Sequence, residues 1–216
     1  MTHFHRSRRV ALAWLSSVLF FTLSACSVLP ESETLTFYRL PSPSAALGSQ
    51  SVQQPRSDEV LQIDTPYGDR AVDSTRLLVI PDPDRISAYK GARWSDRAPV
   101  LFRDRLIEAF RSAGVFRTVV ADSSTLSADL ELSGDLTWFH VVYRDGVPVV
   151  RIAYDANLSN VSSSRIVGSQ RFIVEQPVQG KEVTEVVQAF GLALDKLSVR
   201  VLEWVQQQSK IRPDGR

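Results

Sequence analysis

The chain contains few residues of the types that carry out covalent or metal chemistry. Among its 216 residues there is one cysteine, Cys26, and there are three histidines, His3, His5 and His140. A single cysteine excludes a disulfide framework and a cysteine-based zinc cluster. Because two of the histidines lie in the first few residues, Cys26 and His140 are the groups whose chemistry matters most.

Cys26 lies at the end of a segment that has the features of a signal peptide. Three arginines within residues 6–9 precede an apolar run of 14 residues, 10–23. This length fits the roughly 7–15 residues of a signal-peptide core and falls below the ~20 of a membrane span. Residues 23–26, Leu-Ser-Ala-Cys, resemble the bacterial lipobox. In that signal the cysteine sulfur receives a diacylglyceryl group, the chain is cut just before the cysteine, and the new amine is acylated. The alternatives are a plain secretory signal with an incidental cysteine, or a membrane span.

The sequence has no other recognisable signature of catalysis. His140 lies in a predicted strand between Phe139 and Val141, without the glycine pattern of a nucleophile elbow. Neither GxxxxGK[ST] nor GxGxxG occurs, so no nucleotide-binding loop is expected. Four aspartates do not have the spacing of a calcium loop: Asp82, Asp84, Asp96 and Asp104. We therefore predict no catalytic residues, no metal site and no cofactor.

Charge and length indicate one domain behind a cleaved leader. The chain has 25 Lys and Arg against 24 Asp and Glu, and removal of residues 1–25 would leave 22 basic and 24 acidic residues. Nucleic-acid binding requires a clear basic excess, so nucleic acid is not an expected partner. We predict a lipoprotein signal peptide at 1–25, a lipidated tether with a flexible segment at 26–58, and an α+β domain at 59–210.

Alternating apolar residues predict a set of strands in this domain. The expected strands are 60–63, 76–80, 86–89, 138–143, 147–158 and 166–175. Asp145-Gly146 is a strong hairpin signal between two of them. Leu130, Leu132, Leu136 and Trp138 have even spacing, so an uninterrupted strand would place all four side chains on one face.

Two stretches have the apolar period of a helix. The first begins near Ser95 or Asp96, tolerates Pro99 in its first turn and ends at Gly114. The second extends over about 181–208, roughly 40 Å at 1.5 Å per residue. Its apolar stripe could contact a membrane or partner, but packing on the sheet is the simpler interpretation. The predicted fold class is α+β, a mostly antiparallel sheet packed by two amphipathic helices.

Two short aromatic and basic segments are candidates for a partner interface. Phe37, Tyr38 and Arg39 form an extended segment close to the tether, which could pair with a sheet edge of this chain or of a partner. Arg93 and Trp94 precede the first helix. Trp94 is either a core residue or an interface anchor, because Trp and Arg are enriched at binding hot spots.

These features occur in an order that resembles a known family. The lipobox is followed by Phe-Tyr-Arg-Leu at 37–40, Pro-Tyr-Gly-Asp-Arg at 66–70 and Arg-Trp-Ser-Asp at 93–96. The chain is similar, over about residues 36–207, to the ABC-type transport auxiliary lipoprotein components. This family resembles the lipoprotein member of paraquat-inducible systems, which accompany MCE (mammalian cell entry) proteins. The sequence departs from the pattern at Gly68, where a larger apolar residue is expected.

The resemblance implies a non-enzymatic, lipid-anchored auxiliary subunit of a system that moves lipids or related hydrophobic compounds between the inner and outer membranes. The implied partners are an MCE-domain protein and an ABC permease and ATPase, or a paraquat-inducible-type membrane protein. Ser27 after the cysteine, in place of the aspartate that retains many lipoproteins at the inner membrane, predicts the periplasmic face of the outer membrane. A lipid-binding periplasmic shuttle and a structural outer-membrane assembly lipoprotein are alternatives, and homo-oligomerisation is left open.

Overall fold

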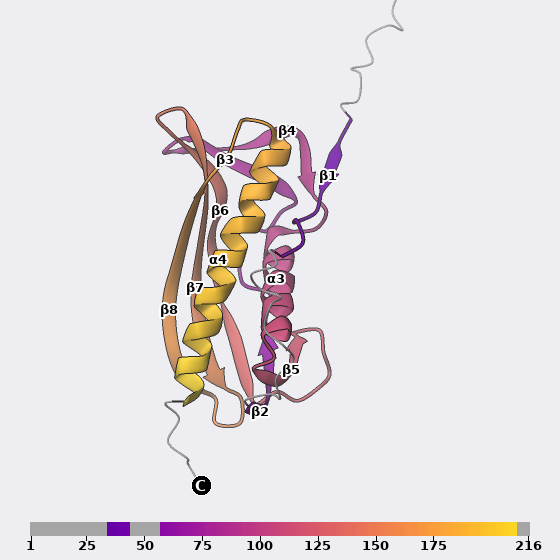
Figure 1. Cartoon of the computed structure of the whole chain (residues 1–216), viewed down its shortest axis with the longest axis vertical. Helices are drawn as coiled ribbons and strands as arrows, with labels where there is room; N and C mark the ends of the chain where they lie inside the picture. The colour runs from indigo at the N-terminus through magenta and orange to yellow at the C-terminus, as the bar shows by residue number, and fades with distance from the viewer. Residues whose placement is uncertain (1–33, 44–56, 211–216) are drawn as a thin grey trace, which may run out of the picture. The chain divides into compact units, whose positions relative to one another are not determined.

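The computed structural model describes residues 34–43 and 57–210. The predicted signal peptide, Cys26 and most of the predicted flexible segment lie outside these ranges. In chain order the elements are β1 (Thr36–Tyr38), β2 (Ser57–Ile63), β3 (Arg76–Asp82), β4 (Arg85–Trp94), α3 (Ala98–Ala113), β5 (Phe116–Ala121), β6 (Leu130–Arg144), β7 (Val147–Asn160), β8 (Arg165–Pro177) and α4 (Val183–Lys210) (Figure 1).

The strands form a single mixed sheet, with β6 at its centre. One edge of β6 pairs antiparallel with β7, which pairs antiparallel with β8. The other edge is shared, because β2 pairs in parallel with residues 130–132 and β3 in parallel with residues 140–142. Beyond them, β5 is parallel to β2, β4 is antiparallel to β3, and β1 is parallel to β4.

The prediction of a mostly antiparallel sheet is therefore wrong. Alternation of apolar residues shows which side of a strand is buried, and it carries no information about which strand lies next to it. The parallel pairs here join segments that are distant in the sequence, such as β2 and β6. The predicted third short strand, 86–89, is the first half of a longer strand, β4, and β5 is a strand that the sequence analysis did not predict.

Both predicted helices are present, and they cover one face of the sheet (Figure 1). Phe102 of α3 packs against Tyr154 of β7 with ring centroids 4.8 Å apart. Phe190 of α4 packs against Phe139 of β6 at 4.7 Å. All four side chains are buried, and burial of a large apolar side chain stabilises a fold by about 1.5–3 kcal/mol. The apolar stripes of both helices are thus buried in the core.

The ends of α3 follow from its sequence. The helix begins at Ala98, a little after the predicted start, and Pro99 occupies its first turn. Gly114 adopts a left-handed conformation at φ 60° and its N–H donates to Arg111 O at 3.2 Å, as expected for a glycine-capped end. Phe116 then folds back to stack on Phe110, with ring centroids 6.2 Å apart.

The hairpin turn between β6 and β7 is confirmed. Asp145 and Gly146 both have positive φ, 51° and 77°. Two consecutive positive φ values match the right-handed twist of the flanking strands, and aspartate followed by glycine is the residue pair that adopts them at least cost.

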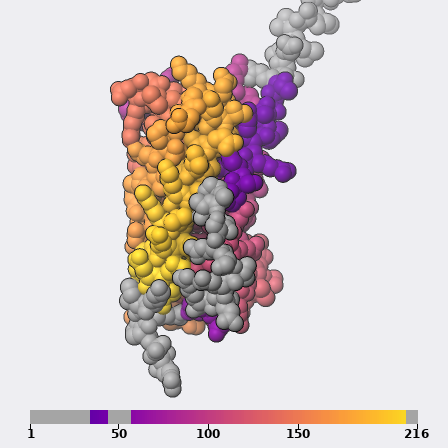
Figure 2. Space-filling model, viewed as in Figure 1, coloured from indigo at the N-terminus to yellow at the C-terminus, as the bar shows by residue number. Residues whose placement is uncertain are grey.

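The segment before the predicted domain boundary joins the folded unit. Residues 36–38 form β1 at the edge of the sheet, and Ser95 N donates to Tyr38 O at 2.8 Å. Pro41 O accepts a hydrogen bond from the buried Arg105, which lies 3.4 Å from Asp195 of α4. The indigo atoms of β1 accordingly lie beside the orange start of α4 in the space-filling view (Figure 2). Residues 36–41 are therefore held to the body by both backbone and side-chain contacts.

Candidate binding site

The course of β6 changes at Thr137, and this change decides which side chains reach the open face of the sheet. The register between β6 and β7 shifts between Leu136 and Trp138, as in a β-bulge. Before the shift the leucines of β6 are buried, and after it Phe139 and Val141 take the buried positions. Trp138 therefore lies on the opposite face from Leu136. The prediction that Trp138 shares a face with the leucines is wrong, since it holds only for a strand without a bulge.

A groove of about 570 Å³ lies on the face that the helices leave uncovered. We call it the open-face groove. Its apolar lining includes Leu78, Ile80, Ile86, Trp138 and Val142, and its polar lining includes Asp69, His140, Arg144 and Arg151. Pockets that hold small ligands usually measure about 300–1,000 Å³ and combine an apolar lining with a few polar groups. The open-face groove has both properties.

His140 is uncharged in this groove. Burial, together with the nearby positive charge of Arg151, lowers the pKa of His140 to about 4. The Arg151 guanidinium lies over the Trp138 ring, 4.0 Å from its centroid, and the Arg171 guanidinium lies 5.5 Å from it. These are distances at which a cation and an aromatic ring attract each other. The floor of the groove is therefore an aromatic and guanidinium surface beside a neutral imidazole.

The arginines of the groove are held by one carboxylate. Arg144 donates two hydrogen bonds to Glu175, both at 2.6 Å, and Arg151 Nε lies 2.9 Å from Glu175 Oε1. The Arg144 hydrogen bonds are the main reason why the pKa of Glu175 is below its ordinary value. Because Asp69 and Asp82 also line the groove, its positive and negative charges are balanced.

The lining of the groove offers contacts for binding a ligand. Among residues 34–43 and 57–210, no cluster of three or more His, Cys, Asp or Glu side chains could hold a metal ion. The groove offers apolar walls, the aromatic rings of Trp138 and Tyr143, and fixed guanidinium groups.

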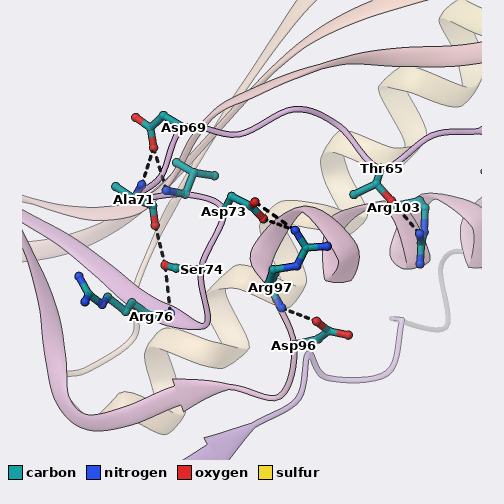
Figure 3. A network of polar contacts seen from close by, with 10 residues as sticks. Thr65, Asp69, Ala71, Asp73, Ser74, Arg76, Asp96, Arg97 and Arg103 are labelled. Carbon is teal, nitrogen blue, oxygen red and sulfur yellow. Dashed lines mark hydrogen bonds and ion pairs between the residues drawn. The ribbon is translucent and has the colours of Figure 1, made fainter.

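One wall of the groove comes from the loop between β2 and β3, and this loop is held to the start of α3 (Figure 3). Asp69 Oδ1 accepts hydrogen bonds from the N–H groups of Ala71 and Val72, both at 2.9 Å. Arg97 donates to both oxygens of Asp73, at 2.8 and 3.0 Å. The structure thus brings the segment that follows the 66–70 motif next to the residue that follows the 93–96 motif.

Gly68 has a steric role in the same loop. A Cβ atom at this position would lie 3.2 Å from Val72 Cγ1 and 3.4 Å from Pro99 Cγ. These contacts leave little space for a side chain, so the glycine allows the loop to lie close to the first turn of α3. The departure from the family pattern at Gly68 therefore has a local physical reason.

The segments singled out as a partner interface lie next to each other. Phe37 is opposite Arg93 and Tyr38 is opposite Trp94 in the pairing of β1 with β4. Phe37 is 64% exposed, Arg39 is exposed, and Tyr38 and Arg93 are half-buried. Trp94 is fully buried, with its ring 5.1 Å from Phe190 and 5.9 Å from Phe139. This is the position that the core interpretation of Trp94 requires.

The sequence analysis did not anticipate the open-face groove. Trp138, His140 and Val142 alternate along β6, which indicates a shared face. No sequence signal marks the register shift at Thr137, and Arg151 joins them only through the pairing of β6 with β7. The lipidation candidate Cys26 lies outside the described residues.

Among the described residues, no helix combines the length and the apolar character needed to cross a membrane. None of the curated proteins compared with the chain matches it. The crystal structure of protein XCC0632 from Xanthomonas campestris, a DUF330 protein, is similar at a TM-score of 0.70 and 26% identity, covering 81% of this chain and 97% of that one. Hypothetical protein CT253 from Chlamydia trachomatis has the same fold at a TM-score of 0.52 and 9% identity, covering 70% and 97%.

The family comparison agrees with the resemblance seen in the sequence. The sequence model of the ABC-type transport auxiliary lipoprotein components matches residues 38–201. The matched range extends from β1 into α4 and includes both motifs, 66–70 and 93–96. This is a family of auxiliary transport lipoproteins rather than a known enzyme family, and its character fits a membrane-anchored periplasmic protein. The chain belongs to the ABC-type transport auxiliary lipoprotein component family.

Proposed function

We propose that this protein is a lipid-anchored, non-enzymatic auxiliary subunit of an MCE/ABC-type system that moves lipids, or related hydrophobic compounds, between the inner and outer membranes. Acyl groups on Cys26 hold it in the periplasmic leaflet of the outer membrane. Its direct partner is the periplasmic part of an MCE-domain protein, and a permease and ATPase, or a paraquat-inducible-type membrane protein, completes the system. In this role the domain docks the transporter and performs no bond-making step.

The observation that carries this proposal is the family match over residues 38–201. The packing of the core supports it, because the apolar stripes of α3 and α4 are buried against the sheet. Those stripes are therefore not available as walls of a large internal lipid cavity. A domain whose core is filled in this way is better suited to docking on its surface than to enclosing acyl chains.

Direct binding is the test of the adaptor function. The protein without its signal and acyl groups, residues 27–216, should bind the periplasmic part of its MCE partner in a calorimetric titration. It should also leave purification without stoichiometric phospholipid in native mass spectrometry. One lipid per domain together with no measurable MCE binding would favour the shuttle over the adaptor.

The open-face groove favours a second candidate, in which the domain binds one amphiphile on its surface. The groove has the volume of a ligand site, about 570 Å³, with apolar walls beside fixed guanidinium groups. His140 would report on binding, because it is the one histidine in residues 27–216. Addition of lysophosphatidylglycerol should shift the His140 imidazole signals in a proton NMR spectrum, while Val142→Asp should abolish the shift. Unchanged His140 signals at saturating lysophospholipid would rule out this candidate.

A further inference from the structure

The register of the strands defines the end of the folded unit at which the chain enters from the anchor. β1 is parallel to β4, with Thr36 opposite Ala92 and Tyr38 opposite Trp94. β4 begins at Arg85, directly after the turn that joins it to β3. Moving backwards along β1 therefore leads towards the β3–β4 turn. β1 pairs with the last three residues of β4, and Figure 1 shows that its start lies at the same upper end of the folded unit as that turn.

The β6–β7 turn lies at the same end. β3 and β6 are parallel, with Ile80 opposite Val142, so both strands finish at this end of the sheet. Figure 1 shows β1, the β3–β4 hairpin and the β6–β7 turn together at the top of the view. We call this end of the folded unit the hairpin end.

Exposed apolar side chains gather at the hairpin end. Five of the twelve large hydrophobic residues that are exposed in the described part of the chain lie in β1, directly before it, or within two residues of the two turns: Leu35, Phe37, Ile86, Tyr143 and Val147. Phe37 is 64% and Ile86 59% exposed. Leu35 and Phe37 share one face of β1, because they are two residues apart in an extended segment. A tyrosine beside aliphatic side chains is typical of a membrane–water interface.

The charges at the hairpin end are two ion pairs and two exposed carboxylates. Arg85 Nη2 lies 2.8 Å from Asp82 Oδ2, and Arg144 is hydrogen-bonded to Glu175. Asp84 and Asp145 are exposed in the two turns. The apolar side chains beside them gain from contact with the acyl boundary of a bilayer.

The length of the tether limits how the domain can be oriented. Cys26 and Leu35 are nine residues apart, which is at most roughly 30 Å when fully extended. β7 has 14 residues, so the sheet extends roughly 45 Å from the hairpin end towards the β7–β8 turn. A tether shorter than the sheet cannot run back along it and place the β7–β8 turn on the membrane.

The tether cannot gain length cheaply by detaching the start of the fold. Residues 36–38 are paired with β4, and Tyr38 O accepts from Ser95 N. Pro41 O accepts from Arg105, whose side chain is buried between the helices near Asp195. Detaching this segment would leave a buried guanidinium with fewer partners, which is costly.

From these observations we infer that the hairpin end rests on the surface of the bilayer that holds the anchor. Leu35, Phe37, Ile86, Tyr143 and Val147 contact the lipid, and the β7–β8 end points away into the periplasm. This inference rests on the proposed lipidation of Cys26. It also leaves the distal end of the sheet, rather than the hairpin end, for the transport partner.

The test measures depth at two matched positions in the full lipidated protein. With Cys26 acylated, the mature chain has no other cysteine, so an introduced cysteine is the one thiol available for labelling. Ile86→Cys at the hairpin end and Ile166→Cys at the start of β8 replace the same exposed residue type. Each variant is labelled with a polarity-sensitive fluorophore and reconstituted in vesicles of phosphatidylethanolamine and phosphatidylglycerol that contain a nitroxide-labelled lipid.

We expect lipid quenching of the Ile86→Cys label to be several-fold stronger than that of the Ile166→Cys label. Equal quenching, or stronger quenching at residue 166, would overturn the inference. If the label at residue 86 is unquenched by lipid and instead responds to the MCE partner, the hairpin end is a protein interface and the inference is wrong. Co-flotation of the protein with the vesicles checks anchoring separately, so that failure of lipidation is distinguished from a different orientation.

Discussion

Trp94, the last residue of β4, links β1 to the core between the sheet and α4. Its ring is fully buried between Phe139 and Phe190, and its backbone pairs with Tyr38 of β1. We expect Trp94→Ala to destabilise the folded domain by about 3–5 kcal/mol, because it removes a large buried aromatic side chain and leaves a cavity. Urea or thermal unfolding of residues 27–216 measures this loss. Phe37→Ala, at an exposed ring in the adjacent strand, is the control and should unfold close to wild type.

His140 predicts a pH dependence of stability. Its pKa is about 4 in the folded protein against 6.5 ordinarily, so between these values the unfolded chain binds a proton that the folded protein does not. The contribution of the neutral His140 side chain to the stability of the fold is complete above pH 6.5 and is lost as the pH falls towards 4. After allowance for partial solvent screening, we expect the free energy of unfolding to fall by about 1–2 kcal/mol between pH 7 and pH 4.5. Urea unfolding should show this loss as the difference between wild type and His140→Gln, because other carboxylates such as Asp64 and Glu131, whose pKa values are raised, titrate in both proteins. An imidazole titration midpoint near 6.5 by NMR would contradict the prediction.

The proposed lipidation of Cys26 predicts how the chain is processed. Cys26→Ala should abolish palmitate labelling and leave an uncleaved precursor, because the sulfur that accepts the lipid is absent. Ser27→Asp is the matched control: it keeps the cysteine, so labelling should persist while the protein shifts towards the inner membrane. Metabolic labelling and membrane fractionation give both results. Labelling of the Cys26→Ala protein at the wild-type level would disprove lipidation at this residue.

At the scale of elements, β6 is the strand on which the rest of the sheet depends. Its first half pairs with β2 and its second half with β3, while β7 runs along its other edge. Where the partner changes, Gly134 O accepts from Tyr67 N at 2.9 Å. Gly134 itself has φ 147°. The strand therefore needs an unusual backbone conformation at the point where the two halves of the sheet join.

Gly134→Ala should weaken this junction. A Cβ atom there would lie far inside contact distance of the Asp155 carbonyl oxygen on β7, so β6 and β7 would have to separate. Strain at a special backbone position costs about 1–3 kcal/mol, and the steric overlap adds to it. Chemical denaturation quantifies the effect. Gly146→Asn is the control, because it lies in open space at the turn and asparagine tolerates positive φ; similar losses in both variants would refute the argument.

At the scale of the whole molecule, the sequence predicts the helices and strands better than it predicts which strands pair with each other. Both helices, the glycine cap at Gly114 and the Asp145-Gly146 turn follow from local rules that the sequence displays directly. The mixed sheet depends on which distant strands meet, and the open-face groove depends on the register shift at Thr137. Neither has a local signal. The candidate groove was therefore beyond sequence reasoning, although its residues Trp138 and His140 alternate visibly along one strand.

The tether and the sheet together predict how orientation depends on tether length. Insertion of 12 Gly and Ser residues after Ser27 would raise the maximum reach to roughly 70 Å, longer than the roughly 45 Å of β7. The inverted orientation then becomes accessible, so we expect the difference in lipid quenching between labels at residues 86 and 166 to shrink. Palmitate labelling and the unfolding midpoint should stay at wild-type values, because the insertion precedes β1. An undiminished difference would mean that the apolar side chains of the hairpin end, and not the short tether, set the orientation.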